Sequence, residues 1–262
     1  MSSHCRLLLL AALVLPLAGE AATCSRQSPP HTVALVELYT SEGCSSCPPA
    51  DRWLSELVSR YSGDQLVALS LHVDYWDYIG WRDRFGDARF SARQRQLSRL
   101  AGGSTIYTPE VFVGIRELRS WRNPAELAER VRRINAQPAA AQVGVQMKAK
   151  AGDSVEIEAT FALNPKMASG QQGEGLVILY EDRLFSEVRA GENRGSRLQH
   201  DRVARYWSAP VVIDAQSGSA GWKQSIALPA DWKRENLGVV ALLQDGRSGE
   251  VLQTVSMPAC IP

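Results

Sequence analysis

The chain has 262 residues, of which 45% are hydrophobic and 22% are charged. This is the composition of a soluble globular protein with enough apolar side chains for a substantial core, and the length suits one large domain or two ordinary ones. The formal net charge of +1 gives no general reason to expect nucleic acid or an anionic membrane as a partner.

The first segment, residues 1–22, has the features of a secretory signal peptide. A short start with Arg6 precedes the apolar stretch 7–18, and small residues follow at 19–22. Such a segment is removed during export, here near Ala21. The apolar stretch is shorter than a membrane-spanning helix. We therefore expect a periplasmic or secreted protein with no membrane span after cleavage.

The next hundred or so residues predict strands that alternate with helices. Buried strands are expected at residues 32–40, 65–76 and 107–115, where apolar and β-branched side chains follow one another. Helices are expected directly after a CxxC motif, at residues 88–100 and at residues 123–136. This alternation indicates βαβ units, and thus an α/β domain over residues 31–137.

The pattern then changes to an apolar–polar alternation with a period of two. Short runs of this kind recur to the end of the chain, with Gly, Pro, Asp and Ser between most of them. Such spacing predicts an all-β, sandwich-like domain of about seven strands over residues 142–262. We place the boundary between the two domains at residues 137–142.

Export to an oxidising compartment bears on how the cysteines pair. Cys5 leaves with the signal peptide, and the remaining four allow three pairings. We favour the pairing of Cys44 with Cys47 and of Cys24 with Cys260, because chain ends often lie close together and an oxidising compartment preserves structural disulfides. The alternative is that Cys24 and Cys260 remain free thiols on the tails.

The CxxC motif, Cys44 and Cys47, stands at the start of a helix that we expect to begin near Pro48. Free N–H groups and the helix dipole favour a thiolate at such a position. Cys44 is then the attacking thiolate and Cys47 the resolving thiol. Glu42 and Asp51 flank the pair, and their negative charge disfavours a thiolate. We therefore expect the pKa of Cys44 to be less depressed than in strong oxidants.

Further residues match the needs of a dithiol site. The Thr108–Pro109 bond, at the start of a strand, is a candidate cis peptide bond that presents a backbone edge to a peptide substrate. Glu37 is the one acid in the strand that leads to the motif. Buried beneath Cys47 with a raised pKa, it would accept the proton of that thiol. The alternative is an acid near the strand end that reaches solvent.

Four side chains are candidates for substrate binding. His72, Tyr75 and Trp76 follow the second strand, at the edge where α/β sheets place their sites. His200 lies in the basic, turn-rich segment 191–205, which could fold over the dithiol and bind a partner or substrate. The alternatives are aromatic packing with a satisfied histidine for the first three residues, and an ordinary solvated connection for the last.

Three segments, VELYTSEGCSSCPPAD, LHVDYWDYIGW and YTPEVFV, together resemble the thioredoxin superfamily. More narrowly, they resemble a family of secreted bacterial thioredoxin-like proteins that carries a domain-of-unknown-function label. The resemblance extends to GENRGSRLQHDRVAR in the second half of the chain. It implies a thioredoxin-like fold for residues 31–137, and it supports the roles given to Cys44, Cys47, Thr108, Pro109 and Glu37.

The leading hypothesis is an exported thiol–disulfide oxidoreductase that acts on protein or small-molecule disulfides and thiols. Such a reaction needs no organic cofactor and no metal, only a redox partner that resets the dithiol. One alternative is a protein that handles Cu(I) or Zn(II), because thiolates suit soft metals. The other is a non-catalytic binding protein in which the Cys44–Cys47 disulfide is structural.

Overall fold

The computed structural model describes residues 23–150, 152–165, 172–213 and 216–260. The predicted signal peptide, with Cys5, lies outside these residues. No helix in the described ranges is long and apolar enough to cross a membrane. The α-helices of these ranges are α1 (Pro48–Arg60), α2 (Ala88–Leu100) and α3 (Pro124–Asn135), and the 3-10 helices are η1 (Asp77–Ile79) and η2 (Arg234–Asn236).

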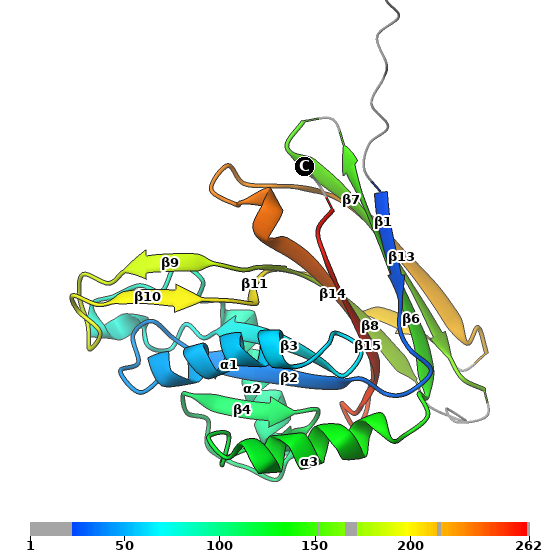
Figure 1. The fold of residues 1–262 in the computed structure, drawn as a ribbon, viewed down its shortest axis with the longest axis horizontal. Coiled ribbons are helices and arrows are strands. Elements are labelled where there is room, and N and C mark those ends of the chain that lie inside the picture. The colour runs from blue at the N-terminus through cyan, green and yellow to red at the C-terminus, as the bar shows by residue number, and fades with distance from the viewer. Residues whose placement is uncertain (1–22, 151, 166–171, 214–215, 261–262) are drawn as a thin grey trace, which may run out of the picture.

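The largest sheet joins strands from both halves of the chain (Figure 1). Its nine strands are, in spatial order, β15 (Val251–Pro258), β14 (Leu237–Asp245), β8 (Gly173–Glu181), β11 (Val203–Trp207), β3 (Leu66–His72), β2 (Ala34–Thr40), β4 (Glu110–Val113) and β5 (Arg116–Glu117), with β12 (Val211–Ile213) beside β8. The two halves meet where β11 runs parallel to β3, with Val203 opposite Ser70.

Two smaller sheets complete the β structure of the described residues. One has four strands in the order β1 (Thr23–Gln27), β6 (Ala141–Lys150), β7 (Ser154–Leu163) and β13 (Ser219–Ala227). The other is the two-stranded hairpin of β9 (Leu184–Glu187) and β10 (Arg197–His200). In Figure 1 the hairpin extends over the same end of the large sheet as the start of α1.

The predicted fold class, an α/β thioredoxin-like domain followed by an all-β sandwich-like domain, is wrong. The protein is mostly β: 43% of it is strand, arranged in several sheets, and 19% is helix. The predicted strand and helix segments of the first half do exist, but β3 is not the edge of a small sheet. An unpaired strand edge attracts a further strand, and here β11 from the second half takes that place. The predicted boundary at residues 137–142 stays a prediction.

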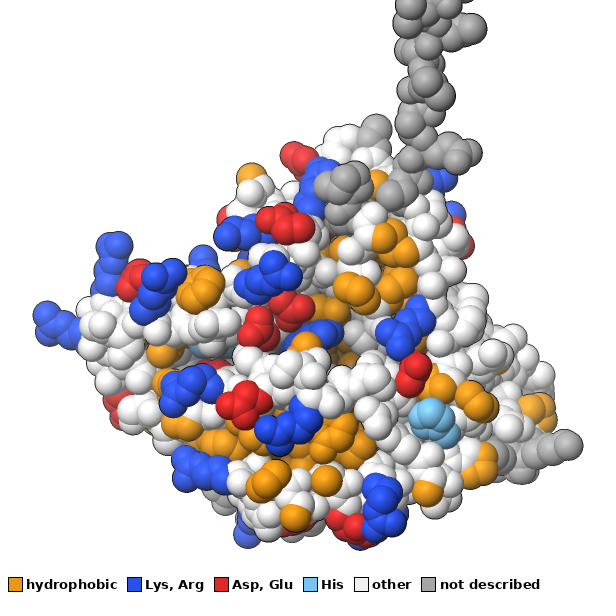
Figure 2. Space-filling model, in the orientation of Figure 1, with side chains coloured by type: hydrophobic (Ala, Val, Ile, Leu, Met, Phe, Trp, Pro, Cys, Tyr) orange, Lys and Arg blue, Asp and Glu red, His pale blue; other side chains and the backbone are white. Residues whose placement is uncertain are grey.

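Side chains alternate between the faces of the large sheet, and this divides the core into layers. On one face, Leu35 and Tyr39 of β2 join Ile178 of β8 in a single apolar cluster that α2 covers. On the other face, α1 and α3 pack on Val36 and its neighbours. Farther along that second face, the four-stranded sheet packs on Val177 and the strands beside it. Figure 2 shows that acidic and basic side chains are interspersed over the surface in view.

A disulfide joins Cys24 to Cys260, and their Cα atoms are 6.0 Å apart. Cys24 lies in β1, opposite Met147 of β6, and Cys260 follows β15. The bond therefore links the four-stranded sheet to the edge of the large sheet. It closes a loop of almost the whole described chain, which restricts the unfolded state more than a short loop does.

Replacing both cysteines, in Cys24→Ala/Cys260→Ala, is expected to lower the free energy of unfolding by about 2–5 kcal/mol, because the unfolded chain gains conformational freedom. Urea unfolding followed by circular dichroism measures this change. An unfolding midpoint equal to that of the unmodified protein would contradict the structural role of the bond.

Candidate functional site

The CxxC motif lies where β2 ends and α1 begins. Cys47 is the N-cap residue of α1, and prolines occupy the first helical positions, as expected for a helix that starts at Pro48. The chain between strand and helix turns tightly, because Cys44 N–H donates to the Ser41 carbonyl and Cys47 N–H to the Cys44 carbonyl. Cys44 and Cys47 form a disulfide, with Cα atoms 5.4 Å apart.

The Thr108–Pro109 peptide bond is cis, and it lies beside the disulfide. The Thr108 carbonyl oxygen is 3.7 Å from Cys44 Sγ, and Trp76 Nε1 donates a hydrogen bond of 2.7 Å to Thr108 Oγ1. The structure thus brings together five of the residues singled out by the sequence, namely Cys44, Cys47, Trp76, Thr108 and Pro109.

The disulfide is covered. Cys44 is 1% exposed and Cys47 is 0% exposed. The loop that joins β9 to β10 lies over the motif, and Asn193 Nδ2 donates to the carbonyls of Glu42 and Cys44 at 2.8 and 2.9 Å. The carboxylate of Glu192 accepts a hydrogen bond from Ser45 N–H at 3.0 Å. We expected from the sequence that segment 191–205 could fold over the dithiol, and the contacts of Glu192 and Asn193 confirm this. The individual contacts could not be predicted, because they join segments far apart in the chain.

A reciprocal pair of aspartates marks the point where the hairpin leaves the large sheet. Asp182 accepts from Arg202 N–H, and Asp201 accepts from Arg183 N–H, each at 2.8 Å. Both arginines have a left-handed backbone, with φ of 59° and 56°. That conformation is costly for a residue with a side chain, and the two aspartate bonds stabilise it. They set the direction in which the hairpin continues.

Five ionisable side chains are buried together behind the motif. They are contributed by four different parts of the chain: the CxxC turn and α1, the end of β3, the segment after η1, and the end of β10. The five residues are Glu42, Asp51, His72, Asp83 and His200, none more than 4% exposed. Asp51 lies one helical turn after Cys47, so the two side chains share a face of α1.

The two histidines of this cluster differ in how closely they are bound. His72 Nδ1 is 2.7 Å from Asp83 Oδ2, which also accepts a hydrogen bond from Glu42 N–H at 2.8 Å. His200 is 3.4 Å from the Glu42 carboxylate and 3.6 Å from that of Asp51. The His72 and His200 rings meet edge to face, with centroids 4.8 Å apart. Within the described residues, neither ring nitrogen of His200 has a hydrogen-bond partner.

The environment pushes the pKa values of these groups apart. Burial raises the pKa of Asp51 above its usual range, against the opposing effect of His200. For Asp83, burial is outweighed by the charge and hydrogen bond of His72, so its pKa is lowered. Conversely, Asp83 outweighs burial and raises the pKa of His72. Glu42 is buried too, but His200 lowers its pKa. The cluster therefore holds acids of different strength.

The predicted substrate-binding role of the histidines needs correction. His72 and His200 are 0% and 1% exposed, so neither reaches a ligand at the surface. Tyr75 is half-buried, and its hydroxyl donates to Gln94 of α2. Trp76 contacts Thr108 beside the disulfide, on the side of the motif away from the two histidines' buried cluster. The acids Glu42 and Asp51, expected to flank the dithiol, instead share the buried space with His200.

Glu37 does not lie beneath Cys47. Its carboxylate binds Arg93 of α2 at 2.5 and 2.8 Å and accepts from the Tyr39 hydroxyl at 2.6 Å. Successive strand residues point to opposite faces, and α1 packs on the face that carries Leu38. Position 37 therefore faces α2. This is a correction of the predicted proton acceptor.

A second buried carboxyl group, Glu110, follows the cis bond. It is 2% exposed and accepts a hydrogen bond of 2.6 Å from Gln94 Nε2. Burial raises its pKa to about 7. Its side chain is directed toward α2, on the face of the sheet opposite α1, because Phe112 of the same strand belongs to the cluster under α2.

The raised pKa of Glu110 makes a prediction about stability. The pKa of this carboxyl group is higher in the folded than in the unfolded protein. Its contribution to stability is therefore fully present below the unfolded-state pKa, and it is lost as the pH rises toward the folded-state pKa. Between pH 4.5 and pH 7, the free energy of unfolding of the protein is therefore expected to fall by up to about 3 kcal/mol, measured against that of the Glu110→Gln variant. Urea unfolding of both proteins across this range tests it, and parallel pH curves would contradict it.

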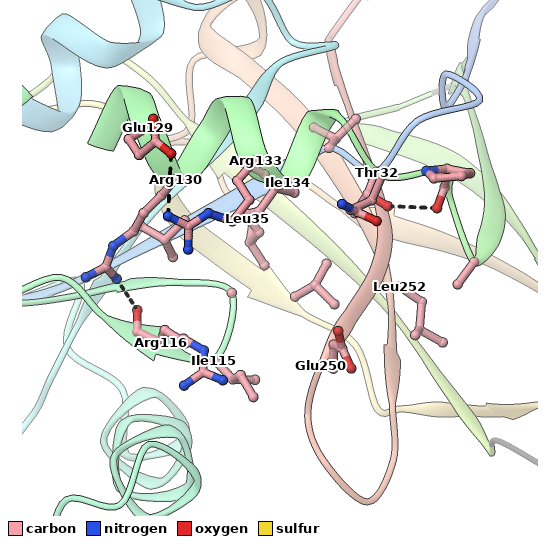
Figure 3. A pocket seen from close by; sticks show the side chains of 18 of the residues that line it. Thr32, Leu35, Ile115, Arg116, Glu129, Arg130, Arg133, Ile134, Glu250 and Leu252 are labelled. Carbon is pink, nitrogen blue, oxygen red and sulfur yellow. Dashed lines mark hydrogen bonds and ion pairs between the residues drawn. The ribbon is translucent and has the colours of Figure 1, made fainter. Parts of the chain in front are cut away.

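A groove of about 670 Å³ lies at the opposite end of β2 (Figure 3). Arg130 and Glu129 of α3 line one side, and Glu250 and Leu252 line the other. The Arg130 guanidinium is already bound to the Glu126 carboxylate at 2.7 Å. The groove begins where β2 starts, whereas the dithiol follows its last residue, so the two sites are separate.

The comparisons give a family but no activity. The family model of proteins of unknown function named DUF1223 matches residues 35–244. No curated protein matches the chain. A crystal structure of an Agrobacterium tumefaciens protein is 25% identical, with a TM-score of 0.59, and the match covers 88% of this chain and 96% of that one.

A second solved structure, HBP35 of Porphyromonas gingivalis, is 12% identical with a TM-score of 0.68. The match covers 88% of this chain and 76% of that one. At this identity the likeness concerns the fold alone.

Proposed function

The chain belongs to the DUF1223 family of proteins of unknown function, and we propose that it is a thiol–disulfide oxidoreductase whose active pair is Cys44 and Cys47. The observation that carries the proposal is the buried acid–base cluster next to the CxxC turn. Buried ionisable groups with shifted pKa values cost free energy in a fold, and they gather at functional sites. A bond that only stapled the start of α1 would not need them.

The proposed reaction is an exchange of disulfides. In the reduced protein, the Cys44 thiolate attacks one sulfur of a substrate disulfide and releases the other as a thiolate. The Cys47 thiol then loses its proton, and its sulfur attacks Cys44 Sγ in the mixed disulfide. This forms the Cys44–Cys47 disulfide and releases the second substrate thiolate. The pair loses two electrons and the substrate disulfide gains them. A redox partner reduces the pair again.

Asp51 is the proposed acceptor of the Cys47 proton. It lies four residues after Cys47, and side chains at this spacing in a helix are neighbours, with Cβ atoms about 5–6 Å apart. Burial raises its pKa, which makes it a better base than an exposed aspartate. His200, 3.6 Å from its carboxylate, stabilises the ionised form that Asp51 needs before it accepts a proton.

The proposal includes export. Two disulfides are typical of proteins in an oxidising compartment, and the N-terminal sequence has the pattern of a signal peptide. The substrates would then be disulfides or thiols of the periplasm or the extracellular medium. Within the described residues, no group of three or more His, Cys, Asp or Glu side chains is arranged to hold a metal ion. The metal-handling alternative stays a prediction.

Replacing the attacking thiol, in Cys44→Ala, is expected to reduce turnover of a peptide disulfide to the uncatalysed rate, because no other thiolate starts the exchange. The assay follows reduction of the peptide with dithiothreitol as the source of electrons. The Cys24→Ala/Cys260→Ala variant is the matched control, since it also lacks one disulfide, and it should keep its activity. Full activity in Cys44→Ala would refute the proposed function.

Replacing the proton acceptor, in Asp51→Asn, is expected to slow the second exchange step at least about tenfold near pH 6. The mixed disulfide then accumulates in a single turnover, which mass spectrometry of acid-quenched samples detects. The defect should shrink as the pH rises, because hydroxide then replaces the carboxylate as the acceptor of the thiol proton.

The control for this variant is Glu56→Gln, an exposed acid-to-amide change on the same helix. It should resolve the mixed disulfide as fast as the unmodified protein. If Asp51→Asn does so too at every pH, Asp51 is not the proton acceptor.

A further inference from the structure

We propose that the loop between β9 and β10 is an internal cover that competes with the substrate for the backbone of the CxxC turn. This inference rests on the proposed function. It is drawn from the contacts of Asn193 and Glu192, which use three polar backbone groups around Cys44. The substrate class that fits is a peptide segment carrying a disulfide, because a peptide offers N–H donors and C=O acceptors of its own.

The cover supplies hydrogen bonds that the turn does not make by itself. The Cys44 carbonyl also accepts from Cys47 N–H within the turn, so the cover uses its second lone pair. The carbonyls of Glu42 and Cys44 are bound by one amide group, Asn193 Nδ2. Ser45 N–H, at the exposed side of the turn, is bound by the Glu192 carboxylate. Asn193 lies in a surface loop and is nevertheless only 8% exposed, so its side chain fills the space against the turn. Buried polar groups are costly without partners, and a displaced loop leaves these groups for a ligand.

Gly191 allows the loop to lie this close. A Cβ atom at this position would be 3.1 Å from Ile79 Cδ1 and 3.3 Å from Trp81 Cβ. Its φ of 71° is also in the left-handed region that favours glycine. The loop therefore rests on the segment that follows β3, and its displacement uncovers the apolar surface of Ile79 beside the polar backbone of the turn.

The loop can move as a unit, because it is closed by its own hydrogen bonds. Val188 N–H donates to the Ser196 carbonyl, and Gly195 N–H donates to the Val188 carbonyl. Neither bond involves the CxxC turn. To uncover Cys44, the loop must therefore break its three side-chain hydrogen bonds to the CxxC turn. Two of these come from Asn193 and one from Glu192.

The test measures access to the disulfide directly. Oxidised protein is treated with dithiothreitol, free thiols are alkylated at timed intervals, and reduction of Cys44–Cys47 is followed by peptide mass spectrometry. A covered disulfide reacts in proportion to the population of the open state. Asn193→Ala is expected to increase the rate about tenfold, because two hydrogen bonds that favour the closed state are lost. Glu192→Ala should give a smaller increase.

Gln199→Ala is the matched control, since this exposed amide lies in the same hairpin and points away from the core. It should leave the rate unchanged. Equal rates in the unmodified protein, Asn193→Ala and Glu192→Ala would overturn the proposal.

The competition itself is tested by the KM for a peptide disulfide, which should fall in Asn193→Ala because the substrate no longer has to displace the amide. A higher KM would make Asn193 a substrate ligand and would overturn the competition. The dithiothreitol rates need no enzymatic activity. Faster reduction in Asn193→Ala together with a fully active Cys44→Ala would therefore refute the proposed function and leave the cover standing. An unchanged reduction rate in Asn193→Ala together with an inactive Cys44→Ala would refute the cover alone.

Discussion

The parallel pairing of β11 with β3 determines where the candidate site is assembled. Val203 lies opposite Ser70, and Ser70 N–H donates to the Arg202 carbonyl at the same place. Because the hairpin of β9 and β10 directly precedes β11, this pairing carries the hairpin to the end of β3. His200 then meets His72, and the loop of the hairpin reaches Cys44. Without this pairing the loop of the hairpin would not cover the dithiol, which follows the end of β2.

The same pairing explains why so much charge is buried. Glu42, Asp51 and Asp83 belong to the N-terminal half, and without His200 their three carboxyl groups would share one buried histidine, His72. Each buried ion costs several kcal/mol unless it is well paired. His200 provides a second imidazole and lies between Glu42 and Asp51. The second half of the chain thus both covers the dithiol and completes the set of ionisable groups behind it.

Local patterns in the sequence predicted the local structure well. The start of α1 at Pro48 and the strands on both sides of it follow from apolar spacing and proline placement. The meeting of the CxxC motif with Thr108–Pro109 was expected from the needs of a dithiol site and from the family resemblance. The pairing of β3 with β11 could not be predicted, because it joins strands far apart in the chain and leaves no mark on either. Glu37 shows how little separates a correct from a wrong assignment, since a shift of one residue along a strand changes the face. The predicted fold class was wrong because the pairing of β3 with β11 could not be predicted.

The proposed roles, a redox-active pair for Cys44–Cys47 and a structural bond for Cys24–Cys260, are tested most directly by the reduction potential of each bond. Equilibration with defined dithiothreitol mixtures, followed by alkylation and peptide mass spectrometry, measures both bonds in one protein. We expect a potential above about −300 mV for Cys44–Cys47, and a lower one for Cys24–Cys260. A Cys44–Cys47 potential well below that limit would identify the bond as a structural staple and contradict the proposed function.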